Sequence, residues 1–322
     1  MAVVFQPDGK HLLGGGDDGI RRWRLSDGQE VAKQMGESVY AISVSRDGKW
    51  IACGSQGASV WDGELHEKVI NVEGRTTVWT VDFSQDSTRF ATGTGKSDNK
   101  MSIWSATTGE RLVGPLRHNE DVTGTKFSPH GEHIATACLS GSICVFDSHN
   151  GDELIVIMIE APSWGAITPL AWSNNGQQIF ATSYDNKVRS FDASTGSPLA
   201  ELEVEFLNDR HDVHSIALAP NGKFIATFVD RSISFLDVST PSRIGPVIQD
   251  DAVIRSVTIS QDSNYFAVGR EDGKIVIRHL SKILADSYGP FYVSVCVFIV
   301  PACQTIPIPS AMAINYTGIY LR

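Results

Sequence analysis

The chain has 322 residues, of which 42% are hydrophobic and 20% charged, and its formal net charge is −10. This composition is typical of a globular protein with one large or two ordinary domains. The negative balance argues against nonspecific binding to nucleic acid or to an anionic membrane, because both need a basic surface. Five Cys without a CxxC pair, and a start without a secretory signal, predict an intracellular protein, cytoplasmic or nuclear.

A sequence repeat with a period of 39 to 46 residues runs through the chain. In each copy an alternating apolar run ends in a turn, where Gly accepts positive φ without steric cost. A second run follows, a third ends in an aromatic residue as in "MSIW", and a fourth leads into the next copy. Four short strands per repeat are therefore predicted, with no helical periodicity. The turns close at Gly9, Gly48, Ser87, Gly131, Gly176, Gly222 and Ser263.

Repetition of this unit around an axis predicts an all-β, seven-bladed β-propeller with four antiparallel strands per blade. Such a ring leaves only short protected edges, and each blade buries its faces against its neighbours. The repeats resemble those of the WD-repeat β-propellers over about Val3 to Leu280. Trp61-Asp62 is the one intact WD dipeptide, and substitutes stand at Phe146-Asp147, Phe191-Asp192 and Leu236-Asp237. We expect residues 1–300 to form a single propeller.

The C-terminal segment differs in composition from the repeats, because Arg322 is the only charged residue after Ser287. The chain starts directly on an innermost strand, so an outer strand that closes the ring is expected from the other end. The run "YVSVCVFIV", residues 292–300, is the predicted closing strand, and it is too short to span a membrane. The alternative is that this run belongs to a disordered tail. Residues 301–322 are expected to be an irregular apolar tail.

A tripeptide of the phosphate-loop type, Gly95-Lys96-Ser97, lies in the third repeat. A phosphate loop needs a first Gly five residues before the second, and Phe90 occupies that position. The residues that follow alternate like a strand, whereas a phosphate loop is followed by a helix. We therefore predict no nucleotide binding and no cofactor, with Lys96 in a hairpin loop.

The resemblance implies a buried network of Asp, His, Ser/Thr and Trp within a blade. Its His precedes the aromatic residue of the first strand by nine positions, and only His118 fits, with Cys138, Ser140 and Phe146 as expected partners. Ser183 and Asp185 are expected to pair with Phe191, without a His. Arg278-His279 replaces WD in the seventh repeat, which is the weakest copy.

No catalytic constellation is recognisable in the sequence. There is no HExxH, GxSxG, EF-hand loop or paired Cys-His ligand set. Asp82 and Lys126 are the ionisable exceptions on the inner strands, and they belong to different blades. We predict that the chain is not an enzyme and holds no metal. A propeller-type hydrolase, with carboxylates or His at the channel mouth, is the alternative.

Binding is the remaining function class. In relatives of this fold, partners dock on the face formed by the loops before the first strands and by the second-to-third turns. The corresponding top-face positions here are Tyr40, Trp79, Tyr184, Asp212, His214, Arg255 and Glu271. Aromatic residues and Arg are enriched in binding hot spots. Strand parity, however, puts Trp79 on the same face as Phe83, so Trp79 and Tyr40 are predicted either at the rim or between blades.

The leading hypothesis is a non-catalytic protein–protein interaction scaffold that binds a protein or peptide partner, not nucleic acid or membrane, on this face. The alternative is the C-terminal sensor propeller of a larger nucleotide-binding oligomerisation protein.

Overall fold

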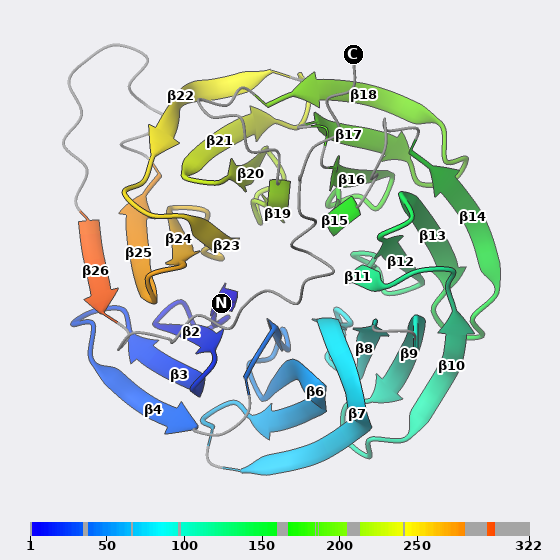
Figure 1. Cartoon of the computed structure of the whole chain (residues 1–322), viewed down its shortest axis with the longest axis horizontal. Coiled ribbons are helices and arrows are strands. Elements are labelled where there is room, and N and C mark those ends of the chain that lie inside the picture. Colours follow the sequence, from blue (N-terminus) through cyan, green and yellow to red (C-terminus); the bar gives the residue numbers. More distant parts are fainter. Residues whose placement is uncertain are drawn as a thin grey trace, which may run out of the picture.

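The computed structural model describes residues 2–34, 38–65, 67–95, 98–159, 167–183, 185, 187–204, 213–240, 242–280 and 295–299. Every regular element in these ranges is a β-strand, and the strands form sheets arranged around a central axis (Figure 1). The prediction of an all-β propeller is therefore confirmed. The numbers of blades and of strands in each blade stay predictions.

Five of the sheets in the described ranges contain four antiparallel strands in chain order. The first holds β1 (Ala2–Phe5), β2 (His11–Gly16), β3 (Gly19–Arg24) and β4 (Glu30–Gln34). The next two hold β11 (Val122–Phe127), β12 (His133–Cys138), β13 (Ser142–Asp147), β14 (Glu153–Met158), and β15 (Ile167–Trp172), β16 (Gln178–Ser183), β17 (Lys187–Asp192), β18 (Pro198–Glu203). The last two hold β19 (Val213–Leu218), β20 (Phe224–Val229), β21 (Ser232–Asp237), β22 (Arg243–Gln249), and β23 (Ile254–Ile259), β24 (Tyr265–Arg270), β25 (Lys274–His279), β26 (Val295–Ile299).

The remaining sheet has six strands, in the order β10-β9-β8-β7-β6-β5. Two of them are long, because β6 and β7 continue where the sequence predicted separate short strands. The β-branched residues Thr76, Thr77 and Val78 favour this extended course, and no Pro interrupts it. The strands are β5 (Ala41–Val44), β6 (Trp50–Asp62), β7 (Lys68–Phe83), β8 (Arg89–Thr94), β9 (Lys100–Ser105) and β10 (Arg111–Arg117).

The phosphate-loop tripeptide lies between two strands, β8 and β9. A strand therefore follows it, as the alternating pattern predicted. Lys96 and Ser97 themselves lie outside the described residues.

The innermost strands contact one another in a closed series. Going round the axis, β1 contacts β5, β5 contacts β7, and the series continues through β11, β15, β19 and β23 back to β1. At the closing contact the Val3 amide donates a hydrogen bond to Ser256 Oγ at 3.3 Å. Apolar cores fill the spaces between sheets: Phe235 of β21, for example, meets Phe266 of β24 with ring centroids 5.3 Å apart.

The turn residues of the repeat all have positive φ, including Ser87 at 62° and Ser263 at 56°. Positive φ is unfavourable for Ser, and both hydroxyls have a structural contact that Gly could not make. Ser87 Oγ accepts a hydrogen bond from the Asp47 amide at 3.2 Å, and Ser263 Oγ accepts one from the Asn221 amide at 3.1 Å. Each Ser therefore ties its turn to the corresponding turn of the preceding repeat.

The His118 contacts differ in part from those the resemblance implied. His118 Nε2 lies 2.9 Å from Thr136 Oγ1, and Nδ1 lies 3.1 Å from the Leu116 carbonyl oxygen. The ring also meets the edge of Phe146, with centroids 5.6 Å apart. The polar partner is thus Thr136, in the middle of β12, rather than Cys138 at its end or Ser140 in the following turn.

The sequence also predicted that Ser183 and Asp185 pair with Phe191, whereas the structure shows another partner for both side chains. Both side chains accept hydrogen bonds from Arg189, two positions before Phe191 on β17. An Arg in mid-strand can reach the turn because its side chain is long, and the carboxylate compensates its charge there. The prediction of a Phe191 contact for these polar groups was therefore wrong.

The last described sheet, in which Arg278-His279 stands in place of WD, contains a buried ion cluster. The Asp250 side chain is fully buried, with Arg270 Nη1 3.0 Å from Oδ1 and Arg278 Nη2 2.8 Å from Oδ2. Asp250 precedes Ile259 by nine residues, as His118 precedes Phe127. The residue that breaks the WD pattern, Arg278, is therefore matched by an acid at the His position.

We expect Asp250→Ala to lower the free energy of unfolding by about 3 kcal/mol, because removing one partner of a buried ion pair leaves uncompensated charge. Urea denaturation followed by circular dichroism measures this. Asp251→Ala is the matched control. The Asp251 carboxylate lies 3.9 Å from Arg270 Nη1 but is 94% exposed, so its removal should leave the free energy of unfolding unchanged. Equal stabilities for the two variants would contradict the structural role of the cluster.

Candidate protein-interaction surface

Four residues of the inner strands share one local feature, a β-bulge: Trp79, Thr123, His214 and Arg255. In β7, Val78 pairs with Thr94 and Thr80 with Gly93, so Trp79 is the extra residue at a register shift. A bulge of this kind bends the strand and re-aims the extra side chain. The same register shift leaves Thr123, His214 and Arg255 as the extra residues of β11, β19 and β23.

Tyr40 and Trp79 lie together. Their ring centroids are 5.1 Å apart and the planes are inclined by 46°. Both side chains are half-buried, and neither belongs to a core cluster, whereas Val78 and Phe83 do. The bulge breaks the strand parity on which the alternative between blades rested, and the two rings meet beside the start of β5 and the bulge of β7.

Gly95 and Asp121 complete this group. A Cβ atom on Gly95 would lie 2.3 Å from Trp79 Nε1 and 2.5 Å from Asp121 Oδ2, so only Gly fits between them. We call Tyr40, Trp79, Gly95 and Asp121 the aromatic rim. Gly95 was noticed in the sequence only as part of a false phosphate-loop motif, and its close approach to the indole is a property of the fold.

Two further predicted residues, Arg255 and Glu271, form an ion pair at 3.0 Å. Both are partly exposed, and they neutralise each other. This pair is separate from the aromatic rim, because β1 lies between β23 and β5 in the ring. Tyr184 and Asp212 lie outside the described residues, as does the side chain of His214.

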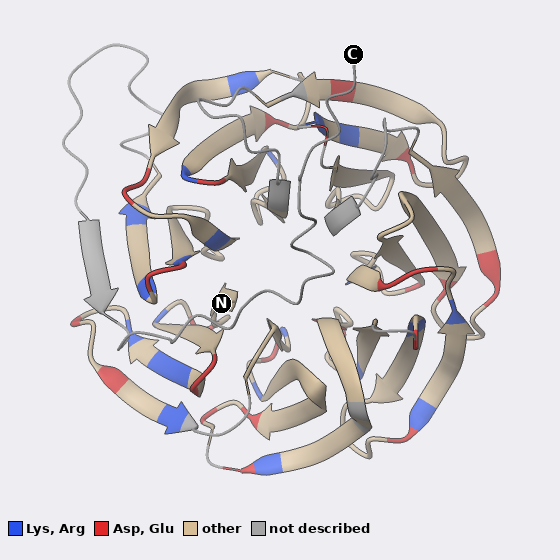
Figure 2. Cartoon of the chain, in the orientation of Figure 1, with Lys and Arg blue, Asp and Glu red and all other residues tan. Residues whose placement is uncertain are grey.

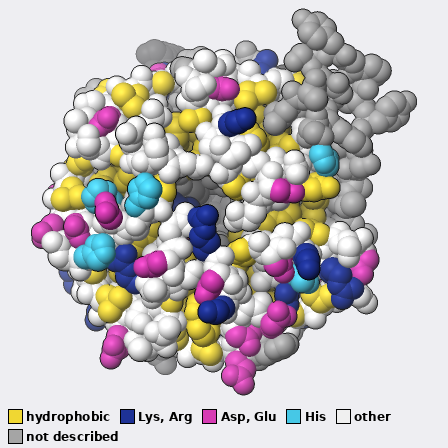
Figure 3. Space-filling view, turned by 180° about the vertical axis from the view of Figure 1, so that it is seen from behind, with side chains coloured by type: hydrophobic (Ala, Val, Ile, Leu, Met, Phe, Trp, Pro, Cys, Tyr) yellow, Lys and Arg dark blue, Asp and Glu magenta, His cyan; other side chains and the backbone are white. Residues whose placement is uncertain are grey.

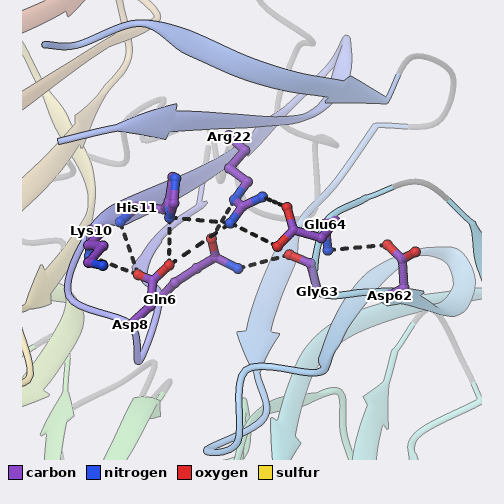
Figure 4. A network of polar contacts seen from close by, with 8 residues as sticks. All are labelled: Gln6, Asp8, Lys10, His11, Arg22, Asp62, Gly63 and Glu64. Atoms are coloured by element: carbon purple, nitrogen blue, oxygen red, sulfur yellow. Dashed lines mark hydrogen bonds and ion pairs between the residues drawn. The ribbon is translucent and has the colours of Figure 1, made fainter. Parts of the chain in front are cut away.

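At the other end of the ring, the turns between first and second strands carry polar contacts that hold sheets together. Arg22 of β3 donates to Gln6 Oε1 at 2.6 Å and is ion-paired with Glu64 of the next sheet (Figure 4). Gln6 Nε2 donates to the Gly63 carbonyl oxygen at 3.1 Å, and His11 Nδ1 lies 2.5 Å from Asp8 Oδ2. These side chains contact one another and join the first sheet to the next, which indicates a structural role.

The face seen from behind in Figure 3 is hollowed at its centre, and histidine side chains gather on one side of it. In the β11–β14 sheet, His130, His133 and His149 lie at or beside turns. Within the described ranges, however, no group of three or more His, Cys, Asp or Glu is placed to hold a metal ion.

Asp82 and Lys126, expected in different blades, are in contact. Lys126 Nζ lies 2.5 Å from Asp82 Oδ1, and the Phe127 amide donates to Asp82 Oδ2 at 3.0 Å. Both carboxylate oxygens are therefore used in joining β7 to β11. This is a structural ion pair between neighbouring inner strands.

Burial makes the described cysteine thiols poor nucleophiles. It raises the pKa of the Cys138 thiol to about 12 and that of Cys144 to about 11, and it raises the pKa of Cys53 as well. A thiol with such a pKa stays protonated at neutral pH and is a poor nucleophile. Burial also lowers the pKa of His118. None of the elements in the described ranges is a helix that could cross a membrane.

The repeat and the ring of antiparallel sheets define a WD-repeat β-propeller. The chain belongs to the family of the first beta-propeller of IFT122, whose family model matches residues 1–279. It is 26% identical to eukaryotic translation initiation factor 3 subunit I of Scheffersomyces stipitis, over 80% of this chain and 82% of that protein. It is 23% identical to the intraflagellar transport protein 122 homolog of Xenopus tropicalis, over 86% of this chain but only 23% of that longer protein.

A solved structure also matches. The β-propeller domain of Myceliophteria thermophila Cps50 (Swd1) superposes with a TM-score of 0.72 at 16% identity, covering 86% of this chain and 94% of that one. This likeness supports the fold alone.

The lowered pKa of His118 predicts a pH dependence of stability. Below the ordinary value of 6.5 the unfolded chain binds a proton that the folded chain does not, so stability should fall as the pH drops through 6.5 and should be retained above it. In His118→Gln this loss should disappear. Denaturant unfolding of both proteins across that pH range measures it, and an equal loss in the variant would show that His118 is not its source.

Proposed function

We propose that this chain is a non-catalytic protein-interaction scaffold whose partner binds at the aromatic rim. The observation that carries the proposal is the half-buried Tyr40–Trp79 contact, held at a bulge beside Gly95 and Asp121. Aromatic side chains offer a large rigid surface with a polar edge, which favours them in interfaces. One similar protein is itself named as a subunit of a larger factor.

The chemistry of the aromatic rim favours a partner with a basic side chain. An Arg or Lys can stack on the Trp79 or Tyr40 ring and approach the Asp121 carboxylate at the same time. The net charge of −10 acts in the same direction and opposes nucleic acid or anionic membrane as partner. Tyr184, Asp212, His214, Arg255 and Glu271 remain proposed contacts further round the same face. An intracellular location is part of the proposal, supported by the free thiols of Cys53, Cys138 and Cys144.

Substitution of the aromatic rim tests this function. Mass spectrometry after affinity capture with the full chain identifies the partner, and calorimetry measures its affinity. We expect Trp79→Ala and Tyr40→Ala each to weaken binding by about tenfold or more, as for a hot-spot residue. Tyr265→Ala is the control, because this ring is 41% exposed at the opposite end of a sheet. Unchanged affinity in Trp79→Ala, or an equal loss in Tyr265→Ala, would contradict the proposal.

We also infer that the ring has seven blades of four strands. Residues 51–54 of β6 pair with β5, residues 58–61 of β6 pair with residues 68–72 of β7, and residues 78–83 of β7 pair with β8. One further pair, Gln56↔Thr77, joins β6 and β7 where the division falls. Division of each long strand at this point turns the six-stranded sheet into two blades. In the last blade β26 would be the outer strand, since it pairs antiparallel with β25 from Lys274↔Ile299 to Arg278↔Val295.

Shortening the chain tests the role of β26. A chain that ends at Asp286 would lose this strand and expose the edge of β25, so it should melt earlier and aggregate. A chain that ends at Gln304 keeps β26 and should melt like the full chain. Scanning calorimetry with light scattering compares the three, and identical melting of the Asp286 chain and the full chain would rule out a closing role.

A further inference from the structure

The outer strands of the sheets are edges, and β4, β10, β18 and β22 carry features that discourage pairing with another strand. Such features are charged residues, Pro, Gly and bulges. The residues with these features are Lys33 in β4, Gly114-Pro115 with register shifts in β10, Pro198 and Glu201 in β18, and Gly245-Pro246 in β22. By contrast, β14 continues from Glu153 as Leu-Ile-Val-Ile-Met, five apolar residues without a break.

The β14 strand is also regular and apolar on both faces. It pairs with β13 without a register shift from Ile155 to Met158. Ile155 and Ile157 pack against the core, while Leu154, Val156 and Met158 on the other face are 49%, 48% and 62% exposed. A strand with two apolar faces is typical of a sheet that is covered on both faces, whereas Leu154, Val156 and Met158 are exposed in the described chain. Within the described chain β14 has a neighbour on one side, β13.

A groove of about 470 Å³ runs beside β14, between it and the β15–β18 sheet. Ile157 and Phe191 are among the residues that line it, together with Leu199, which is 51% exposed. The turn at Gly196 closes against β14, since a Cβ there would lie 2.9 Å from Ile155 Cγ2. Val156 and Met158 also line the groove, so a strand added to the edge of β14 would direct alternate side chains towards it.

The two ends of the groove differ in charge. At the start of β14, Asp152 and Glu153 are exposed, and Asp192, the last residue of β17, is half-buried. Hydrogen bonds from Ser194 and Thr195 lower the pKa of Asp192 to about 2, so it is ionised at neutral pH. Towards the other end, Arg189 and Lys187 are ion-paired with Glu201, and Arg189 also with Asp185. Figure 2 shows acidic residues on both outer strands, β14 and β18.

We propose that β14 is a second docking site, which binds an extended peptide segment of a partner protein as an additional strand. The segment carries apolar residues on both faces, and a Lys or Arg beside Glu153. Main-chain hydrogen bonds supply affinity in this mode, and the groove selects alternate side chains. A second copy of this chain is disfavoured as the occupant, because each copy has a net charge of −10 and the groove end is acidic. The site is independent of the aromatic rim.

Selection of random twelve-residue peptides displayed on phage, with the immobilised full chain as bait, tests the site. Enriched peptides should combine consecutive apolar residues with a terminal Lys or Arg. Calorimetry with the synthetic peptide should show a loss of affinity of about tenfold or more in Val156→Lys. Leu112→Lys is the matched control, since Leu112 is 50% exposed on β10, an outer strand that Pro115 interrupts. This variant should bind the peptide with unchanged affinity.

Peptide N-methylation distinguishes strand addition from simple apolar contact. A strand directs alternate amides to one neighbour. Methylation of one alternate set should therefore abolish binding, while methylation of the other set should leave it intact.

Three results would overturn the proposal. The first is that no enriched peptide loses affinity in Val156→Lys, and the second is that Val156→Lys and Leu112→Lys lose the same affinity. The third is that methylation of neither set of amides changes the affinity of the peptide. Self-association in sedimentation that Val156→Lys abolishes would also overturn it, because a second copy would then be the occupant.

Discussion

The contact between β1 and β23 is the one on which the ring depends. Each sheet has two apolar faces and therefore needs a neighbour on both sides, which only a closed ring supplies. At the closing contact Val3 and Phe5 pack with Ala267, Ile275 and Ile277 of the last sheet. Residues at the two ends of the repeat region thus form one core. Because the ring is closed, the starts of neighbouring inner strands are held at fixed positions, and this brings Tyr40 to Trp79.

The aromatic rim results from a local irregularity on this regular frame. A register shift near the end of β7 removes Trp79 from the strand ladder, and Gly95 leaves space for its indole beside Asp121. Similar shifts recur in β11, β19 and β23, so the fold presents a set of bulged residues whose identity differs from strand to strand. Under the proposed function, variation at these positions would change the partner without changing the core.

The sequence predicted what depends on local pattern and missed what depends on contacts between repeats. Alternation and turn residues are local, and the all-β propeller followed from them. The Lys126–Asp82 ion pair joins residues 44 positions apart, and no spacing rule connects them. Arg278 departs from the WD pattern of the last repeat, and its partner Asp250 lies 28 positions away, so the local sequence does not indicate the ion pair. The bulge at Trp79 was also hidden, since strand parity assumes an unbroken ladder.

The central claim is that a partner binds the aromatic rim, and hydrogen–deuterium exchange of the full chain with and without the captured partner tests it most directly. Bound partner should slow amide exchange in residues 38–41, 77–80 and 121–123 together, because these segments meet at the rim. Exchange at the opposite turns, near Gly9 and Gly131, should not change. Protection confined to those turns, or absent from the three rim segments, would contradict the account.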